Sequence, residues 1–464
     1  MNNNQILDSK SNDKIGSSKE KVNSVVLEAN NVGDKSFSKV TEANKNYADD
    51  MNVFLENEKD PNLTKKIIFI CVYFAVVIGT EFSYRNPLFE ESITIEEDIQ
   101  SGYDKDDFFF EYWKLISELG TAKVTLTIFV CVFFFCPLNF STVILQVISY
   151  ASYTTNVLKM IYKSHRPYWH SDKIIPPCNS GYGNPSGHSM TSVSFYLTLS
   201  HLLTNYQYFE VSKYGNVVKV IVFVVLMCIA FLVMFSRIVL GAHSINQVIY
   251  GGLMGLGIYF IEIHILSYHK YTPKRFINFF KGKINLIVYF SLHLCMLLIS
   301  LIVFLTWSDE TTDEIKKSIF NGIKCKIKKD YLMFQNDGFY QSLSLCGLIG
   351  MHLGILLLFF LLERKGFSLN SNIISWNYSS VLNYFKRLPI ILISGVGILF
   401  YFLIPGKWSL ALIFIFKSMV GFFTATLGIT GIGIYVCIIL NFANEKISFY
   451  KSNIESLSQL QNPS

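Results

Sequence analysis

The stretch GYGNPSGHSMTSVSFYLTLSHLLT, residues 181–204, sets a polar turn rich in glycine and proline directly before an apolar run at about 189–205. A run of this size approaches the length that a helix needs to cross the hydrocarbon core of a bilayer. The turn directs backbone N–H groups toward the N-terminus of the expected helix, where they can bind an anion. The stretch therefore predicts a membrane helix with a polar site at its start.

Apolar runs of similar size occur on both sides of this stretch. Of the 464 residues, 51% are hydrophobic and 16% are charged, which is far from the composition of a water-soluble domain. The other runs lie at about 66–82, 123–138, 140–161, 217–236 and 243–266, and then at about 284–307, 339–362, 388–405 and 409–441. The last run could form one tilted helix or two pieces. We expect an all-α, polytopic transmembrane bundle with a six-helix core and about three to four additional C-terminal transmembrane helices.

The polar segments between these runs divide the chain into four expected parts. Residues 1–62 are rich in Asn, Ser, Lys and Glu, and we expect a disordered, cytosolic N-terminal tail. Residues 63–268 contain the six-span core, in which residues 107–120 predict an amphipathic helix at the membrane interface, because this segment is too charged to span. Residues 269–442 form a C-terminal transmembrane extension, and residues 443–464 form a polar tail.

The charge of the loops predicts their orientation, because cytosolic loops retain Lys and Arg. The loop at 83–123 is dominated by acidic residues, whereas the loops after the sixth and eighth runs are basic. We therefore expect the acidic loop on the non-cytosolic face. Residues 308–338 conflict with this alternation, because they carry six lysines on the face opposite the cytosol.

Three polar clusters interrupt the apolar runs, and alternation of the six spans brings all three to one membrane face. KMIYKSHRP, residues 159–167, places Lys159 and Arg166 seven positions apart, on one helical face. Either cation could instead be a snorkelling side chain at a helix end. The turn quoted above supplies the Ser186 hydroxyl, the Gly187 amide and the imidazole of His188.

The third cluster is SRIVLGAHSINQ, residues 236–247, in which Ser236 and Arg237 end the fifth run and His243 begins the sixth. Ionisable groups at membrane depth are costly, so their placement around one face indicates a functional site. Three cations, a hydroxyl and helix-end amides suit a tetrahedral anion, and two histidines can supply a nucleophile and a proton donor. Phosphoryl transfer is the chemistry that fits this set.

These clusters resemble the three signature motifs of the type-2 phosphatidic acid phosphatase superfamily. The signature consists of Lys, six residues and Arg-Pro; then Pro-Ser-Gly-His; then Ser-Arg, five residues and His, and all parts occur here in order. The resemblance covers about residues 66–266. It implies a phosphoric monoester hydrolase of the membrane that works through a phosphohistidine, without a metal ion or other cofactor.

The resemblance also implies a role for each motif residue. His243 would attack phosphorus in line, and His188 would protonate the leaving alkoxide and then activate water. The phosphoryl oxygens would be held by Lys159, Arg166, Ser186, Gly187, Ser236 and Arg237. Members of the family commonly have Asp four residues after the nucleophile, where this chain has Gln247. An amide can still orient the imidazole, but it stabilises a cationic ring less than a carboxylate does.

The substrate class stays open between two readings. HRPYW at 165–169 and CNSGYGNPSGH at 178–188 resemble the glucose-6-phosphatase versions of the motifs, as does Gln247. The spans around the motifs resemble lipid and sphingoid-base phosphate phosphatases instead, with Tyr168 and Trp169 flanking a headgroup. We expect a lipid phosphate (a sphingoid-base phosphate, phosphatidate or a polyprenyl phosphate), with a sugar phosphatase or a non-catalytic lipid-binding or transport relative as alternatives.

The expected partners are membrane lipids rather than nucleic acid, because the basic residues lie in short connecting segments. The family favours the endoplasmic reticulum or another endomembrane, with a lumenal or extracellular active site. Gly251 and Gly255 predict close helix packing, inside one bundle in preference to a homo-oligomer seam. Most cysteines lie in apolar runs and indicate no metal site, while Cys178 and Cys325 could pair in an oxidising lumen.

Overall fold

The computed structural model describes residues 62–440 apart from 105–106, 136–137, 178–180, 205–214, 267–272, 307–338, 340, 366–387 and most positions between 390 and 418. Every regular element in these residues is helical, so the expected all-α fold is confirmed. Within the described residues, six helices are long and apolar enough to cross a membrane, or seven if one bent pair counts as a span. Both tails, the lysine-rich segment at 308–338 and the Cys178–Cys325 pair lie outside the described residues.

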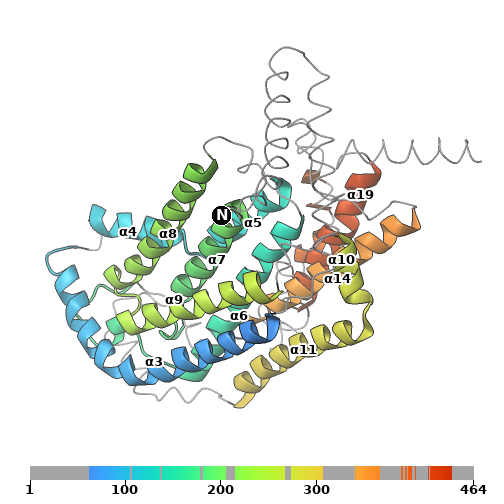
Figure 1. The fold of residues 1–464 in the computed structure, drawn as a ribbon. Helices are drawn as coiled ribbons and strands as arrows, with labels where there is room; N and C mark the ends of the chain where they lie inside the picture. The colour runs from blue at the N-terminus through green and yellow to red at the C-terminus, as the bar shows by residue number, and fades with distance from the viewer. Residues whose placement is uncertain are drawn as a thin grey trace, which may run out of the picture. The chain divides into compact units, whose positions relative to one another are not determined.

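The helices of the core follow the predicted apolar runs (Figure 1). Their bounds are α3 Leu63–Gln100, α4 Phe108–Glu118, α5 Ala122–Phe135, α6 Leu138–Tyr162, α7 Gly187–Thr204, α8 Gly215–Val239 and α9 Ile245–Phe260, the last continuing as a π-helix over Ile261–Leu266. The amphipathic segment expected at 107–120 forms α4, which is followed by a bend of 44° into α5.

Helix α3 is longer than the sequence predicted. We expected the membrane run to end near residue 82, but the helix continues through Pro87 to Gln100. The continuation is hydrogen bonded to the third motif: the Gln100 side chain donates to the carbonyl oxygen of Val239 at 2.9 Å, and the Ser92 hydroxyl accepts from the backbone N–H of Ile245 at 2.9 Å. The acidic segment therefore braces the turn between α8 and α9 instead of forming a loop.

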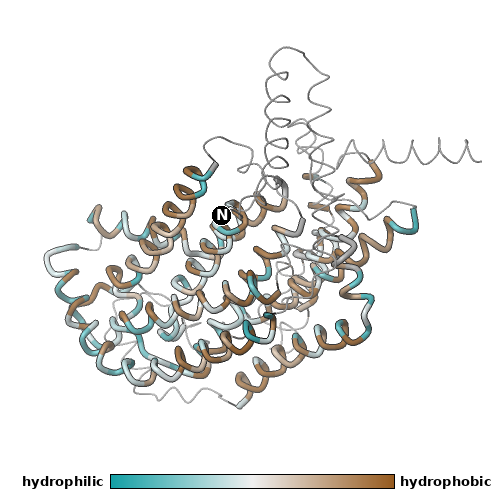
Figure 2. Tube along the Cα trace, viewed as in Figure 1, coloured by the Kyte–Doolittle hydropathy of each residue, from teal (hydrophilic) through white to brown (hydrophobic). Residues whose placement is uncertain are grey.

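Helices α6 and α7 form the centre of the bundle. Helix α7 contacts α6, α8 and α9, while α6 also contacts α5 and α14. Neither helix is among the candidate spans, although both were predicted as membrane runs. Because neighbouring helices cover them, they need little lipid-facing apolar surface and can bury hydroxyl and amide side chains such as Ser141, Gln146 and Ser194. Figure 2 shows the contrast with α8, which is hydrophobic along most of its length.

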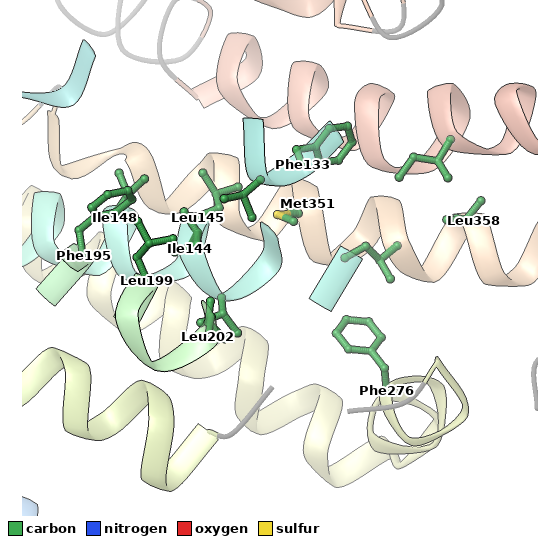
Figure 3. Close-up of a cluster of buried hydrophobic side chains, with 14 of the residues drawn as sticks. Phe133, Ile144, Leu145, Ile148, Phe195, Leu199, Leu202, Phe276, Met351 and Leu358 are labelled. Carbon is green, nitrogen blue, oxygen red and sulfur yellow. The ribbon is translucent and has the colours of Figure 1, made fainter. Parts of the chain in front are cut away.

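One hydrophobic core joins the motif-bearing helices to the C-terminal extension. Figure 3 shows Phe195 and Leu199 of α7 against Ile144 and Ile148 of α6. The same cluster reaches α10 (Pro273–Lys281) and α14 (Ser344–Arg364), through the buried side chains Phe276, Met351 and Leu358. The extension is thus packed on the core by apolar contacts, which favours a single folding unit.

The extension contains further helices at the predicted positions. Helix α11 spans Lys283–Thr306, and α14 occupies the run predicted at 339–362. A continuous helical stretch, Gly421–Ile439, covers α18, a π-helix at Gly428–Gly433 and α19, so this part of the last run is one piece. The run predicted at 388–405 lies mostly outside the described residues, with a short 3-10 helix at Val396–Ile398.

The small residues on α9 pack inside the chain. A Cβ atom added to Gly251 would lie 2.5 Å from the carbonyl oxygen of Ser186, and one added to Gly255 would lie 2.5 Å from that of Met190. Helices α7 and α9 therefore approach each other closely only because these positions carry no side chain. This seam places Ser186 against the first two turns of α9.

Candidate active site

The three polar clusters meet where α6 and α8 end and where α7 and α9 begin. Lys159 lies in the last turn of α6, Arg237 in the last turn of α8 and His188 in the first turn of α7. The charges of Arg166, Arg237, Lys159 and His188 all act on the ring of His243, which lies in the turn before α9. The structure thus brings together residues that are up to 84 positions apart in the sequence.

Arg166 ties the two loops of the site to each other. Its side chain is buried, and Nε donates to the carbonyl oxygen of Gly181 at 2.8 Å, while Nη1 donates to that of Ala242 at 2.7 Å. Nη2 donates to the carbonyl oxygen of Tyr182 at 3.3 Å. Nη1 also lies 3.4 Å from Nε2 of His243, so the same guanidinium that orders the loops faces the imidazole.

The hydrogen bonds of His243 define which nitrogen is available for chemistry. Nδ1 lies 2.8 Å from the carbonyl oxygen of Gly183 and 3.2 Å from Oε1 of Gln247. A carbonyl oxygen can only accept, so Nδ1 carries the proton, and the lone pair of Nε2 accepts a long hydrogen bond from Nη1 of Arg166 at 3.4 Å. Burial, followed by the charges of Arg166, Arg237 and Lys159, lowers the pKa of His243 well below its usual value. The ring is therefore neutral and nucleophilic at neutral pH.

The principal partner of His243 was not predicted from the sequence. The Gly183 carbonyl is closer to Nδ1 than Gln247 is. Gln247 instead joins several groups, since its Nε2 donates to the carbonyl oxygen of His165 at 2.7 Å and its Oε1 accepts from the N–H of Ser244 at 3.4 Å. A Cβ atom on Gly183 would lie 2.5 Å from Nε2 of Gln247, so only glycine allows this approach.

This arrangement predicts a limited catalytic role for Gln247. In Gln247→Leu, the Gly183 carbonyl still fixes the tautomer of His243, so we expect kcat to fall by only about tenfold or less, the equivalent of one neutral hydrogen bond. The carbonyl of His165 loses its donor, and we expect a loss of about 1–3 kcal/mol in stability. Phosphate release and thermal unfolding measure the two effects. A fall in kcat of several thousandfold would contradict the assignment of Gly183 as the main orienting group.

Arg237 is hydrogen bonded to a residue of α4 that the motifs did not indicate. Its Nη1 donates to the hydroxyl of Ser117 on α4 at 2.5 Å, and its buried Nε has no hydrogen-bond partner among the described residues. The neighbouring Ser236 donates its hydroxyl proton to the carbonyl oxygen of Val233 at 2.7 Å. A hydroxyl that donates within its own helix cannot simultaneously donate to a phosphoryl oxygen. To bind a phosphoryl oxygen, the Ser236 hydroxyl would have to exchange this partner, and its ligand role stays a prediction.

The start of α7 is arranged for an anion. The hydroxyl oxygen of Ser186 accepts from the Ser189 hydroxyl at 2.9 Å and from the Ser189 N–H at 3.5 Å, which leaves the proton of Ser186 for another acceptor. A Cβ atom on Gly187 would lie 3.0 Å from the Thr155 methyl group and 3.9 Å from Nζ of Lys159. Glycine at this position thus brings the positive end of α7 close to Lys159.

Two cations of the site, Lys159 and Arg237, carry no ion-paired acid among the described residues. Glu81, a buried acid beside the second motif, already has two donors: Nε of Arg85 at 2.7 Å and the Asn184 amide at 2.8 Å. Arg166 and Arg237 are buried and Lys159 is half-buried, and cations removed from water require a counter-charge, so the cluster favours binding of an anion. In the described part of the chain, no group of three or more His, Cys, Asp or Glu side chains is suited to a metal ion.

His188 and the two aromatic residues of the first motif differ in their surroundings. The half-buried His188 packs next to Gly120, where an added Cβ would lie 3.5 Å from its Cβ and Cδ2 atoms. The charges of Arg237, Lys159 and Arg166 act on its ring. Tyr168, expected beside a headgroup, is buried, whereas Trp169 is half-buried with its ring centroid 5.6 Å from that of His165.

Comparisons with known proteins agree with this motif set. Residues 123–271 match the family model described as the PAP2 superfamily. The chain is 30% identical to glucose-6-phosphatase catalytic subunit 1 of Rattus norvegicus over 142 residues, which cover 27% of this chain and 40% of that protein. It is 30% identical to the Felis catus protein of the same name over 172 residues, or 33% and 46% of the two chains. The matches thus span less than half the length of these relatives. No solved structure matches significantly.

Proposed function

We propose that this protein hydrolyses phosphate monoesters at the junction of α6, α7, α8 and α9. The observation that carries the proposal is the cluster of Lys159, Arg166 and Arg237 around His188 and His243, with no ion pair to Lys159 or Arg237 among the described residues. A phosphoryl dianion supplies the missing negative charge, and the cations stabilise the additional charge that develops on its oxygens during transfer.

The first chemical step transfers the phosphoryl group to His243. The Nε2 lone pair attacks phosphorus, the bond from phosphorus to the substrate oxygen breaks, and the leaving oxygen takes a proton from His188. The negative charge of the bound phosphoryl dianion stabilises the protonated form of His188 that this step requires. The N–H on Nδ1 stays bonded to the carbonyl of Gly183, which stabilises the positive charge that the ring gains. Lys159, Arg237 and the first amides of α7 would hold the phosphoryl oxygens, together with the Ser186 hydroxyl.

The second step returns the enzyme to its starting state. A water molecule attacks the phosphorus of phosphohistidine and gives a proton to His188, which now acts as a base. The bond between Nε2 and phosphorus breaks, and inorganic phosphate leaves. His188 regains in this step the proton that it lost in the first, so the cycle balances with water as the only co-reactant.

The substrate that we favour is a lipid phosphate monoester. We place the protein in an endomembrane, with its active site on the lumenal or extracellular side. The exposed apolar side chains of α4, beside the site, support a lipid substrate. The similarity to proteins named glucose-6-phosphatase supports the second candidate, a sugar phosphate. A lipid-binding or transport relative without catalysis is the alternative that a complete lack of turnover would favour.

A phosphate-release panel tests the reaction and separates these candidates. We expect the purified protein to hydrolyse lipid phosphates in mixed micelles faster than glucose 6-phosphate. Vanadate should inhibit competitively, because it resembles a phosphoryl group in the cation cluster, and a chelator should have little effect. Preference for glucose 6-phosphate would replace the lipid proposal by the sugar one. Absence of phosphate release from every substrate would contradict the enzymatic function.

A further inference from the structure

Helix α4 has three faces with three different environments. Because successive residues turn by about 100° around an α-helix, positions three, four and seven apart share a face. One face is turned to the protein and carries Phe110, Trp113 and Ser117. A second is exposed and apolar, with Phe108, Tyr112 and Leu115. The third is exposed and charged, with Glu111, Lys114 and Glu118.

The protein-facing side of α4 packs against residues 240–242, the turn that precedes His243. Phe110 is buried in one cluster with Leu240 and Ala242, the residue that directly precedes His243. The Trp113 ring centroid lies 5.3 Å from that of Phe235, near the end of α8. One turn further, the Ser117 hydroxyl accepts the hydrogen bond from Arg237. The position of α4 therefore affects the orientation of a cation in the phosphate site.

The apolar face of α4 is large for a helix of 11 residues. Phe108 is 84% exposed and Leu115 is 68% exposed, on a helix whose adjacent face carries an ion pair between Glu111 and Lys114 at 2.5 Å. An apolar stripe next to a charged one is typical of a helix that lies in the boundary between headgroups and acyl chains. Ala122 begins the apolar helix α5 after a bend of 44°, so lipid that surrounds α5 would also reach α4.

We propose that α4 binds the lipid surface through Phe108, Tyr112 and Leu115, and that this contact holds Ser117 against Arg237. The proposal rests on the phosphatase function above. A helix this short is marginally stable without support on its faces. When its apolar face leaves the lipid, α4 loosens, and Arg237 loses the hydrogen bond that orients it. Ser117 is thus a positioning residue, and full turnover depends on the lipid interface.

Lipid contact is measured directly by tryptophan quenching. Phe108→Trp and Lys114→Trp variants of the full chain are placed in phosphatidylcholine vesicles with and without brominated acyl chains. We expect bromine to quench the added fluorescence of Trp at position 108 at least about twofold more than at position 114, because only position 108 faces the acyl region. Equal quenching at the two positions would overturn the docking of α4.

Coupling to the site is measured with a water-soluble aryl phosphate, whose access does not depend on the membrane. In vesicles, we expect Ser117→Ala and Phe108→Ser/Leu115→Ser each to lower kcat about tenfold, as expected for loss of one charge-assisted hydrogen bond. The triple variant Phe108→Ser/Leu115→Ser/Ser117→Ala should have a kcat no lower than that of Ser117→Ala alone, because both changes act through one contact. Ser117→Thr should recover most of the turnover. Glu111→Ala/Lys114→Ala, on the charged face, is the matched control and should stay within twofold of the wild type.

Two results separate this inference from the proposed function. If the triple variant shows the product of the separate losses, or if the apolar-face variant keeps wild-type turnover, Ser117 and the apolar face do not act together, while the phosphatase function stands. If the wild type releases no phosphate, the proposed function fails, and the coupling of α4 to turnover fails with it. The quenching experiment still decides the lipid contact in that case.

Discussion

His243→Ala is expected to lower kcat for phosphate release by about 10³-fold or more, because it removes the nucleophile itself. The structure presents Nε2 of this ring to the site, since Nδ1 is bonded to the carbonyl oxygen of Gly183 at 2.8 Å. The cations that bind phosphate remain in the variant, so inorganic phosphate should still bind with a similar dissociation constant. The measured result is therefore a loss in kcat with binding preserved.

A matched control separates the loss of chemistry from the loss of a buried side chain. His352 is a buried imidazole on α14, hydrogen bonded to the Tyr289 hydroxyl at 2.5 Å and outside the proposed site. His352→Ala should reduce thermal stability, as expected for a cavity and a lost hydrogen bond, while kcat of the folded protein stays within a few-fold. Wild-type kcat in purified His243→Ala would show that another group attacks phosphorus.

The helices could be predicted from the sequence because the signal for a membrane helix is local. An apolar run of sufficient length identifies α8 or α11 without knowledge of its neighbours. The second half of α3 could not be predicted in this way, since its acidic residues indicated a loop. They are accommodated by distant partners, such as the Ser171 hydroxyl, which donates to Glu97 across 74 positions. Tertiary contacts of this kind leave no periodic pattern in the sequence.

The same distinction applies to the candidate site. Lys159, Arg166, His188 and His243 were identifiable because spacing and residue type indicate their chemistry. The carbonyl of Gly183 was missed, because every residue has a backbone oxygen and only the fold selects which one reaches His243. Ser117 was missed for a related reason, since 120 positions separate it from Arg237. The groups that orient the site can therefore be identified only with the tertiary structure, whereas the candidate reacting groups can be identified from the sequence.

His188→Ala is expected to have an effect that depends on the leaving group. For an alkyl phosphate, whose alkoxide leaves poorly, loss of the general acid should lower kcat by about 10²–10⁴-fold. For an aryl phosphate with an acidic phenol, the first step needs no proton, and formation of the phosphoenzyme should be much less affected. Single-turnover release of the alcohol or phenol measures this step. An equal loss for both substrates would contradict the role of His188 as general acid.

The second step makes His188→Ala a trap for the intermediate. Water attack requires a base in the same position, so hydrolysis of phosphohistidine should be slow in this variant even when its formation is fast. With an aryl phosphate, we expect a burst of phenol close to one per active site, accompanied by labelled phosphate on the protein that is stable to alkali and labile to acid. The label should be absent in His188→Ala/His243→Ala. The geometry offers Nε2 of His243 as the acceptor in the first step. A burst that survives in the double variant would contradict this assignment and place the covalent phosphate on another residue.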